Sequence, residues 1–198
     1  MSYVREEPLN ETNYPPFAQI KEAFGFIPNF FRAQSMRTDL IEAEVNLTGT
    51  ILVKQGALTR QQKEYIFLVC SAANLSTYCV TAHCEMVRML GISGPEPEQI
   101  AIDFTSTRLP LVMKALLQFA AKLNSEPTKV GRADIDTLRT FGYTDEQIME
   151  AVVVVSKSTE HGCIAISPER PRAKRNAITT RRRKSKLCCR RKPNTPGP

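Results

Sequence analysis

The stretch "SAANLSTYCVTAHCEM", residues 71–86, decides how this sequence is interpreted. It follows an almost wholly apolar segment, permits a turn at Asn74 and Leu75, and then places Cys79 and His83 four residues apart. Residues four apart lie on the same face of a helix, so the thiol and the imidazole can meet. The stretch therefore predicts a helical hairpin whose second helix carries both groups.

The segments on either side of this hairpin also have helical patterns. Ser76, Thr59 and Thr144 are the expected N-caps of three of the helices, because their hydroxyls can accept a hydrogen bond from the first turn. Residues 151–155, "AVVVV", have the propensity of a strand, but the start signal "TDEQIME" before them favours a helix. The predicted fold class is therefore all-α, with helices over residues 41–53, 60–73, 77–90, 110–124, 134–142 and 144–156.

Two of these segments resemble each other. "LTRQQKEYIFLVCS" (58–71) and "YTDEQIMEAVVVVS" (143–156) share a threonine cap, a glutamine, a glutamate before an apolar run, and a closing serine. A duplicated helical hairpin would produce such a pattern.

The positive charge of the chain is concentrated at its C-terminal end. Residues 157–198 hold 13 Lys and Arg and two acidic residues, a net charge of +11, which leaves −4 for residues 1–156. The C-terminal segment has many prolines and no sustained periodicity, so it cannot bury enough apolar surface to offset its ordering entropy. We therefore expect a helical domain over residues 1–156 and a basic, disordered tail over residues 157–198.

The composition is that of a globular protein and does not indicate binding to a membrane. No apolar run reaches the roughly 20 residues of a membrane span. The start, "MSYVREEPLNETNYPP", has acidic residues and prolines where a secretory signal would be basic and then apolar. We expect a cytoplasmic protein, in which the six cysteines are mostly reduced.

Glu64, Ser76, Cys79 and His83 form the candidate catalytic set. With Ser76 as the N-cap, Cys79 falls in the first helical turn, where the helix dipole and free N–H groups favour a thiolate. His83 could take the thiol proton, and Glu64 on the preceding helix could orient the imidazole. Thiolates of this kind attack peroxides and disulfides and pass through sulfenic acid.

The same residues allow other interpretations. A cysteine in an apolar helical hairpin is usually an inert small hydrophobe, and a histidine beside it is often structural. A metal site of Cys79, His83 and Glu64 fits less well, because structural zinc prefers four ligands and neither C-x-x-C nor H-E-x-x-H is present. Cys84 lies about 140° around the helix from Cys79 and is a poor disulfide partner for it. No cofactor is expected.

"KEYIFLVCSAANLSTYCVTAHCEMVRMLG" (63–91) resembles the signature hairpin of the alkylhydroperoxidase D-like superfamily, which includes the carboxymuconolactone decarboxylase family and its peroxidase-related members. "GFIPNFFRAQS" (25–35) is similar to the opening segment of that family, and residues 138–155 are similar to the start of its second hairpin. The resemblance covers residues 20–155. It implies a bundle of repeated helical hairpins that assembles as a homo-oligomer.

The resemblance also implies roles for the candidate residues. Cys79 matches the reactive thiol of the family's peroxidases, His83 the histidine that helps to deprotonate it, and Glu64 the far end of the proton relay. Ser76 stands where those peroxidases have the cysteine that forms the disulfide, and a serine cannot resolve a sulfenic acid. The expected function is a thiol-dependent peroxidase with a hydroperoxide substrate and an external thiol or dithiol reductant.

Two other functions remain compatible with the sequence. A decarboxylase or ring-opening enzyme would use His83 as general acid and base and leave Cys79 incidental. A non-catalytic protein could bind nucleic acid phosphates through the basic clusters of residues 157–198, although these residues include no tyrosine, phenylalanine or tryptophan for base stacking. The break in pattern after residue 155 also suggests the hypothesis that the tail is read in a shifted frame relative to the family.

Overall fold

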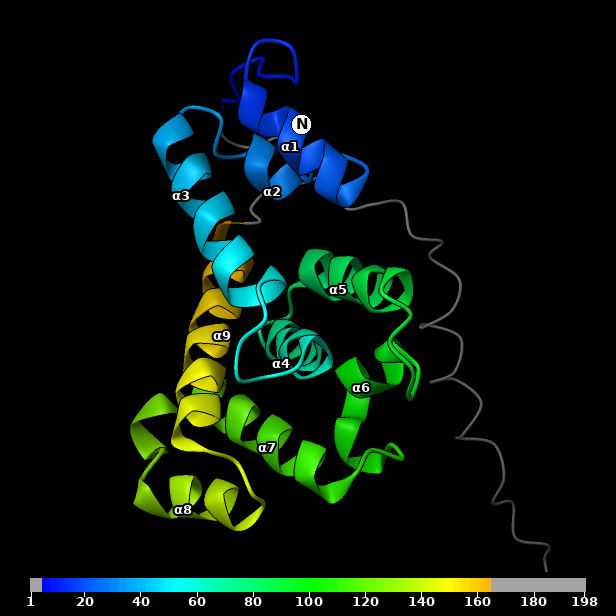
Figure 1. Cartoon of the computed structure of the whole chain (residues 1–198), viewed down its shortest axis with the longest axis vertical. Helices are drawn as coiled ribbons and strands as arrows, with labels where there is room; N and C mark the ends of the chain where they lie inside the picture. The colour runs from blue at the N-terminus through cyan, green and yellow to red at the C-terminus, as the bar shows by residue number, and fades with distance from the viewer. Residues whose placement is uncertain (1–4, 165–198) are drawn as a thin grey trace, which may run out of the picture.

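Helix α4 (Arg60–Ala73) is the central element of the fold. Figure 1 shows it nearly end-on, surrounded by α5 (Thr77–Met89), α6 (Pro97–Asp103), α7 (Leu111–Ser125) and α9 (Asp145–Ile164). Residues 63–71 of α4 are all buried. A helix that is apolar on nearly every face has to be enclosed by other elements, so the sequence of α4 determines its central place.

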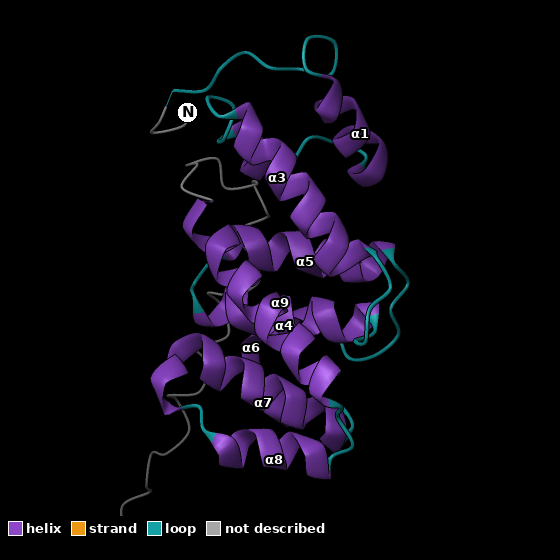
Figure 2. Ribbon diagram, turned by 60° about the vertical axis from the view of Figure 1, so that its left-hand side comes forward, coloured by secondary structure: helices purple, strands orange, loops and turns teal. Residues whose placement is uncertain are grey.

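The computed structural model describes residues 5–164, and within that range every regular element is a helix. Figure 2 shows α5, α4, α7 and α8 stacked, with α1 and α3 beyond one end of the stack. The all-α prediction is confirmed, and residues 151–155 are helical within α9. The remaining elements are α1 (Pro15–Phe24), α2 (Asn29–Arg32), α3 (Thr38–Thr48), the π-helix η1 (Gly49–Val53), the 3-10 helices η2 (Phe104–Ser106) and η3 (Pro127–Lys129), and α8 (Arg132–Thr140).

No helix among residues 5–164 is long and apolar enough to cross a membrane.

The two helices with similar sequences begin in the same way. In α4, Thr59 Oγ1 accepts from the Gln62 N–H at 3.2 Å and Gln62 Oε1 accepts from the Thr59 N–H at 2.8 Å. In α9, Thr144 and Gln147 form the same reciprocal pair at 3.2 and 3.0 Å. Each pair satisfies two backbone N–H groups that a helix start leaves without partners. The predicted caps at Thr59 and Thr144 are therefore confirmed.

Several helix boundaries differ from those predicted. Helices α1, α2 and α6 were not predicted, because they are short or lack a strong apolar period. Pro15 and Pro97 nevertheless begin two of them, as proline does at a first helical turn. The helix predicted over residues 41–53 begins at Thr38, and its last turn is the π-helix η1.

The N-terminal helices have an apolar cluster of their own. It is separate from the main core and consists of Tyr14, Phe17, Ile20, Ile27, Phe30, Phe31 and Ile41. Tyr78 of α5 packs against this cluster, and its hydroxyl accepts a hydrogen bond from the Phe30 N–H at 3.4 Å. We call residues 14–45 the N-terminal unit.

Helix α9 continues beyond Ser156, where the sequence predicted that the helical domain ends. Lys157 and Ser158 are buried, and the Lys157 ammonium pairs with Glu44 of α3 and with Glu160. Helix α9 is thus longer than the helix predicted over residues 144–156, and a buried ion pair between α3 and α9 holds Lys157 in the body. The helix runs to Ile164, and the rest of the predicted basic or frame-shifted tail lies outside the described residues.

The turn between α4 and α5 contains a leucine in the left-handed region. Leu75 has a φ of 57° and is 86% exposed. The N–H groups of Leu75 and Ser76 donate to the carbonyls of Ala72 and Ser71 at 3.1 and 2.9 Å and end α4. The left-handed conformation costs a residue with a Cβ atom roughly 1–2 kcal/mol, and the exposed side chain regains little of this by burial.

We expect Leu75→Gly to raise the free energy of unfolding by about 0.5–1 kcal/mol, because removing the Cβ strain outweighs the entropy that glycine adds to the unfolded chain. Urea unfolding monitored by circular dichroism measures the change. Leu75→Ala keeps the Cβ atom and is the control. Equal stability of the two variants would contradict the expectation.

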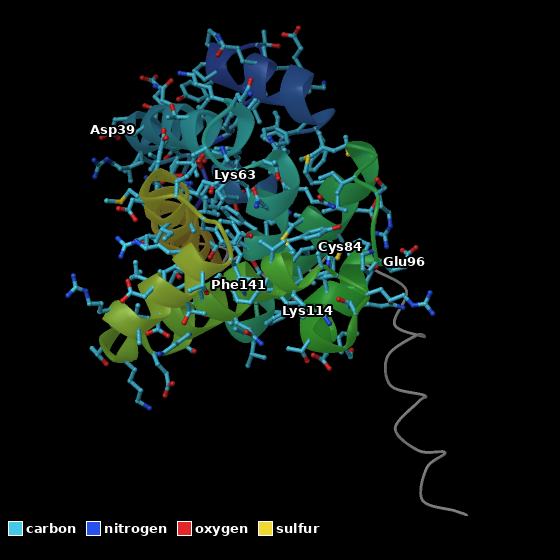
Figure 3. The ribbon with its side chains drawn as sticks, turned by 60° about the horizontal axis from the view of Figure 1, so that its bottom comes forward. Asp39, Lys63, Cys84, Glu96, Lys114 and Phe141 are labelled. Atoms are coloured by element: carbon cyan, nitrogen blue, oxygen red, sulfur yellow. The ribbon has the colours of Figure 1, made fainter. Side chains whose placement is uncertain are left out.

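A second ion pair lies inside the main core. The Lys63 ammonium, with 1% of its side chain exposed, is 2.5 Å from Glu150 Oε1 of α9 and donates to the Lys54 carbonyl at 3.2 Å. Glu150 Oε2 accepts from the Leu58 N–H at 2.7 Å. Figure 3 shows Lys63 within the body of the molecule. The pair fixes α9 against α4.

We expect Glu150→Ala to lower the free energy of unfolding by about 3–5 kcal/mol, because it leaves the Lys63 charge buried without its partner. The double variant Lys63→Met/Glu150→Ala should lose less than the single variant. Chemical unfolding of both checks this. A double variant that is less stable than Glu150→Ala would show that the buried charge is not the cause.

Candidate active site

A cavity of about 780 Å³ opens where the N-terminal unit meets η1, α4 and α5. Its volume is in the range of small-molecule sites. Most of its wall is apolar, with Phe24, Phe26, Ile27, Pro28, Phe30, Phe31, Leu52, Val53, Tyr78, Ala82, Met86 and Met89. The polar groups that reach it include Arg60, Glu64, Cys79, His83 and Glu85.

Three of the four predicted site residues line this cavity. Glu64 comes from α4, and Cys79 and His83 come from successive turns of α5. Ser76 is not among the lining residues and lies at the N-cap position of α5, one turn before Cys79. The hairpin of residues 60–89 therefore brings the predicted thiol, imidazole and carboxylate to one site.

Glu64 and His83 are joined directly. Glu64 is fully buried, and its Oε2 is 2.6 Å from Nδ1 of His83. An ionised carboxylate can only accept a hydrogen bond, so Nδ1 carries the proton in this contact. The other ring nitrogen, Nε2, is then the one that can accept a proton from the cavity. The His83 ring also stacks on Phe67, with centroids 4.4 Å apart and planes at 29°, which fixes its orientation.

The charge of Glu64 is stabilised from two sides. Burial by itself raises the pKa of this carboxyl group, but the charges and hydrogen bonds of His83 and Arg60 outweigh burial and hold the pKa below its ordinary value. Arg60 contacts Oε1 at 2.7 Å, which leaves Oε2 for His83. Sequence analysis missed Arg60, although its place four residues before Glu64 on one helix was a signal for the pair.

Cys79 is a buried thiol with 4% of its surface exposed. Burial raises the pKa of Cys79, and a hydrogen bond with the Ser76 side chain lowers it only in part. Desolvation thus opposes the thiolate that the helix start was expected to favour. Cys79 needs a base at the moment of reaction, and His83 lies in the same cavity.

Ser76 has a different role from the one predicted. It occupies the N-cap position of α5, but its side chain makes no capping hydrogen bond. Its hydroxyl interacts with the Cys79 thiol instead. Ser76 is thus a neighbour of the thiol and not a helix cap.

Two other cysteines, Cys70 and Cys84, lie in the main core. Cys70 and Cys84 are free and buried, and burial raises the pKa of each thiol to about 12. Neither lines the cavity, whereas Cys79 does. Over the described range, no group of three or more His, Cys, Asp or Glu side chains is arranged to hold a metal ion.

No family model matches the sequence, and no curated protein matches it. Among solved structures, an alkylhydroperoxidase AhpD core protein from Ralstonia eutropha JMP134, described as peroxidase-related and uncharacterized, has a TM-score of 0.76 and 26% identity over 83% of this chain and 88% of that chain. A peroxidase-related protein from Silicibacter sp. TM1040 has a TM-score of 0.75 and 23% identity over 84% of this chain and 88% of that chain.

A third similar structure is the debrominase Bmp8, as a cysteine-to-alanine variant in complex with 2,3,4-tribromopyrrole. Its TM-score is 0.70, with 18% identity over 83% of this chain and 89% of that chain. The fold therefore also occurs in a debrominase, and fold alone does not specify the reaction. The similarities as a whole show that this chain belongs to the alkylhydroperoxidase D-like superfamily.

The low pKa of Glu64 makes stability depend on pH. The folded-state pKa lies below the unfolded value of roughly 4.3, so the folded state binds fewer protons in that range. The stabilisation is therefore present above the unfolded value and is lost as the pH falls through the folded one. We expect Glu64→Gln to be less stable than the wild type by about 3 kcal/mol at pH 7 and to lose less on acidification.

Urea unfolding between pH 7 and acid conditions measures this dependence. Glu22→Gln, at an exposed position of α1, is the control and should retain the wild-type pH dependence. Parallel curves for Glu64→Gln and the wild type would contradict the assignment.

Proposed function

We propose that this chain is a thiol-dependent peroxidase that reduces organic hydroperoxides with Cys79 as the nucleophile. The observation that carries the proposal is the shared cavity: it is lined by Cys79 and by a histidine whose Nδ1 is held by a buried carboxylate. This is the arrangement of nucleophile, base and orienting group that activates weak nucleophiles. The similarity to peroxidase-related structures supports it.

The first step forms a sulfenic acid. Nε2 of His83 takes the proton of the Cys79 thiol, and the thiolate attacks the terminal oxygen of the hydroperoxide. An S–O bond forms, the O–O bond breaks, and the leaving alkoxide takes a proton from His83 to give an alcohol. Cys79 is oxidised, the hydroperoxide is reduced, and the imidazole returns to its neutral state. The ion pair with Glu64 stabilises the imidazolium between these events.

The second step needs an external reductant. Ser76 stands beside Cys79 and cannot form a disulfide with it, and Cys70 and Cys84 are buried away from the cavity. One external thiol attacks the sulfenic acid, releases water and forms a mixed disulfide. A second thiol then frees Cys79 and leaves as the disulfide of the reductant. Phe26 and Met89, which line the cavity and are 57% and 64% exposed, mark the side from which a thiol can approach.

The volume and the apolar wall of the cavity favour an organic hydroperoxide over hydrogen peroxide. A hydrogen peroxide molecule would leave most of the roughly 780 Å³ unfilled, whereas an apolar substituent would remove Phe30, Tyr78 and Met86 from water. Such burial can position the O–O bond near Cys79.

The first test uses a variant in which Cys79 is the sole cysteine. Cumene hydroperoxide should convert it to a sulfenic acid that dimedone traps, and dithiothreitol should support turnover. We expect Cys79→Ala in the same background to abolish turnover and His83→Ala to slow it by about 10²-fold. Mass spectrometry and hydroperoxide consumption measure the two steps.

The matched control is Cys84→Ser in the wild-type chain, which should leave turnover unchanged, because Cys84 does not line the cavity. No sulfenic acid at Cys79 would overturn the proposal. Turnover of a carboxylate or lactone substrate that depends on His83 and persists in Cys79→Ser would favour the decarboxylase type of enzyme.

A second test restores a resolving cysteine. We expect Ser76→Cys to form an intramolecular disulfide with Cys79 after hydroperoxide treatment, because residue 76 lies at the N-cap of α5, one turn before Cys79. Peptide mapping without reduction detects the cross-link. Thr77→Cys, one residue further along α5, is the control and should not form it. A sulfenic acid that persists in Ser76→Cys would show that the geometry does not allow resolution.

A further inference from the structure

We propose that Arg60 is a positioning residue that sets the tautomer of His83 by keeping Glu64 ionised. The inference deepens the proposed function and rests on it in one respect, the use of His83 as a base. Arg60 is the first residue of α4, one turn before Glu64, and 28% of its side chain is exposed.

The guanidinium of Arg60 is held by contacts on two sides. Its Nε and Nη2 atoms are each 2.7 Å from Oε1 of Glu64. Its Nη1 atom donates to the Leu52 carbonyl of η1 at 2.9 Å. Leu52 and Arg60 both line the cavity, so one side chain links the cavity wall to the buried carboxylate. The guanidinium is planar and presents its donors in a fixed arrangement, so these contacts define its position.

The protonation state of Glu64 decides which nitrogen of His83 can act as a base. An ionised Glu64 accepts from Nδ1–H, and Nε2 is then free to take the thiol proton. A protonated Glu64 would donate to Nδ1 instead, and the neutral ring would carry its proton on Nε2. That ring could not accept a proton from Cys79. His83 can therefore act as a base only while Glu64 stays ionised, although burial by itself raises the pKa of that carboxyl group.

His83 cannot keep Glu64 ionised when it acts as a base, because a neutral imidazole has no charge to offer. Arg60 has a permanent charge and contacts the same carboxylate, so it stabilises the anion whichever state His83 is in. Arg60 thus selects the tautomer that leaves Nε2 unprotonated, although none of its described interactions is with Cys79 or His83.

Other ionisable groups near this hairpin have separate partners or positions. Glu85, Tyr78 and Cys79 reach the cavity from α5. The rest pair elsewhere: Lys63 of α4 with Glu150 of α9, Glu98 of α6 with Arg88 of α5, and Lys122 of α7 with Asp134 of α8. Arg60 is therefore the permanent cation in contact with Glu64 among the described residues.

The tautomer of His83 can be measured directly. The chain has two histidines, so a protein labelled with ¹⁵N-histidine gives two imidazole spin systems, and His161→Asn assigns them. At pH 8 we expect the wild-type His83 to carry its proton on Nδ1. Arg60→Gln keeps amide donors but loses the charge, so lowering the pH from 8 should move its neutral ring toward Nε2–H, a change that the wild type should not show. Arg60→Lys keeps the charge and should retain the wild-type tautomer.

The pH profile of Cys79 alkylation provides the second measurement, in the variant with Cys79 as the sole cysteine. We expect Arg60→Gln to slow iodoacetamide alkylation about tenfold at acidic pH, because Glu64 without Arg60 gains a proton more readily, and to approach the wild-type rate as the pH rises. Arg60→Lys should follow the wild type. Arg88→Gln, a surface arginine that pairs with Glu85 and Glu98, is the matched control.

A purely structural role for Arg60 predicts a different result, in which alkylation slows equally at every pH and the tautomer is unchanged. That result, or an Nε2–H tautomer in the wild type, would overturn the proposal. If Arg60→Gln fails to fold, the wild-type tautomer and Arg60→Lys still decide it. Measuring the tautomer requires no peroxide turnover. If the wild type showed no peroxidase activity but carried the proton on Nδ1, and Arg60→Gln shifted that tautomer, only the proposed function would be contradicted.

Discussion

The structure depends on the constraint that charges inside an enclosed helix must have partners. Helix α4 is buried along residues 63–71, and this segment includes the charged residues Lys63 and Glu64. An unpaired charge in such a place costs several kcal/mol. Lys63 therefore meets Glu150 of α9, and Glu64 meets His83 of α5 and Arg60 one turn away. These two ion pairs connect α4 to the helices on either side of it.

The same constraint explains the chemistry of the site. A buried carboxylate that accepts from Nδ1 of His83 stabilises the imidazolium and leaves Nε2 available as a base. The nearby thiol of Cys79 is also desolvated, and burial raises its pKa. Burial raises the pKa of both groups, but Arg60 and His83 outweigh it at Glu64, whereas the Ser76 hydroxyl offsets it only in part at Cys79. The site thus places the Cys79 thiol, whose pKa is raised by burial, in the same cavity as His83, which can act as a base.

The cavity exists because the chain has two apolar clusters and not one. The N-terminal unit packs on itself and reaches the main body through Tyr78 of α5 and through the Lys157–Glu44 ion pair between α9 and α3. Tyr78 precedes Cys79 in the chain, so the contact that holds the N-terminal unit also places this aromatic wall beside the thiol. The proposed substrate would bind at the junction of the two clusters.

The sequence by itself determined the elements whose signals are local. Apolar patterns and the caps at Thr59 and Thr144 predicted α4 and α9, the four-residue spacing of Cys79 and His83 put them on one face, and the resemblance of residues 63–91 identified the superfamily. Only the tertiary structure decided that Lys157 belongs to the body, that Arg60 shares Glu64 with His83, and that the N-terminal unit encloses a cavity. These features depend on desolvation and on contacts between distant segments, which a local pattern does not contain. The pKa of Cys79 is a further example, because the helix start that favours a thiolate is visible in the sequence and the burial that raises the pKa is not.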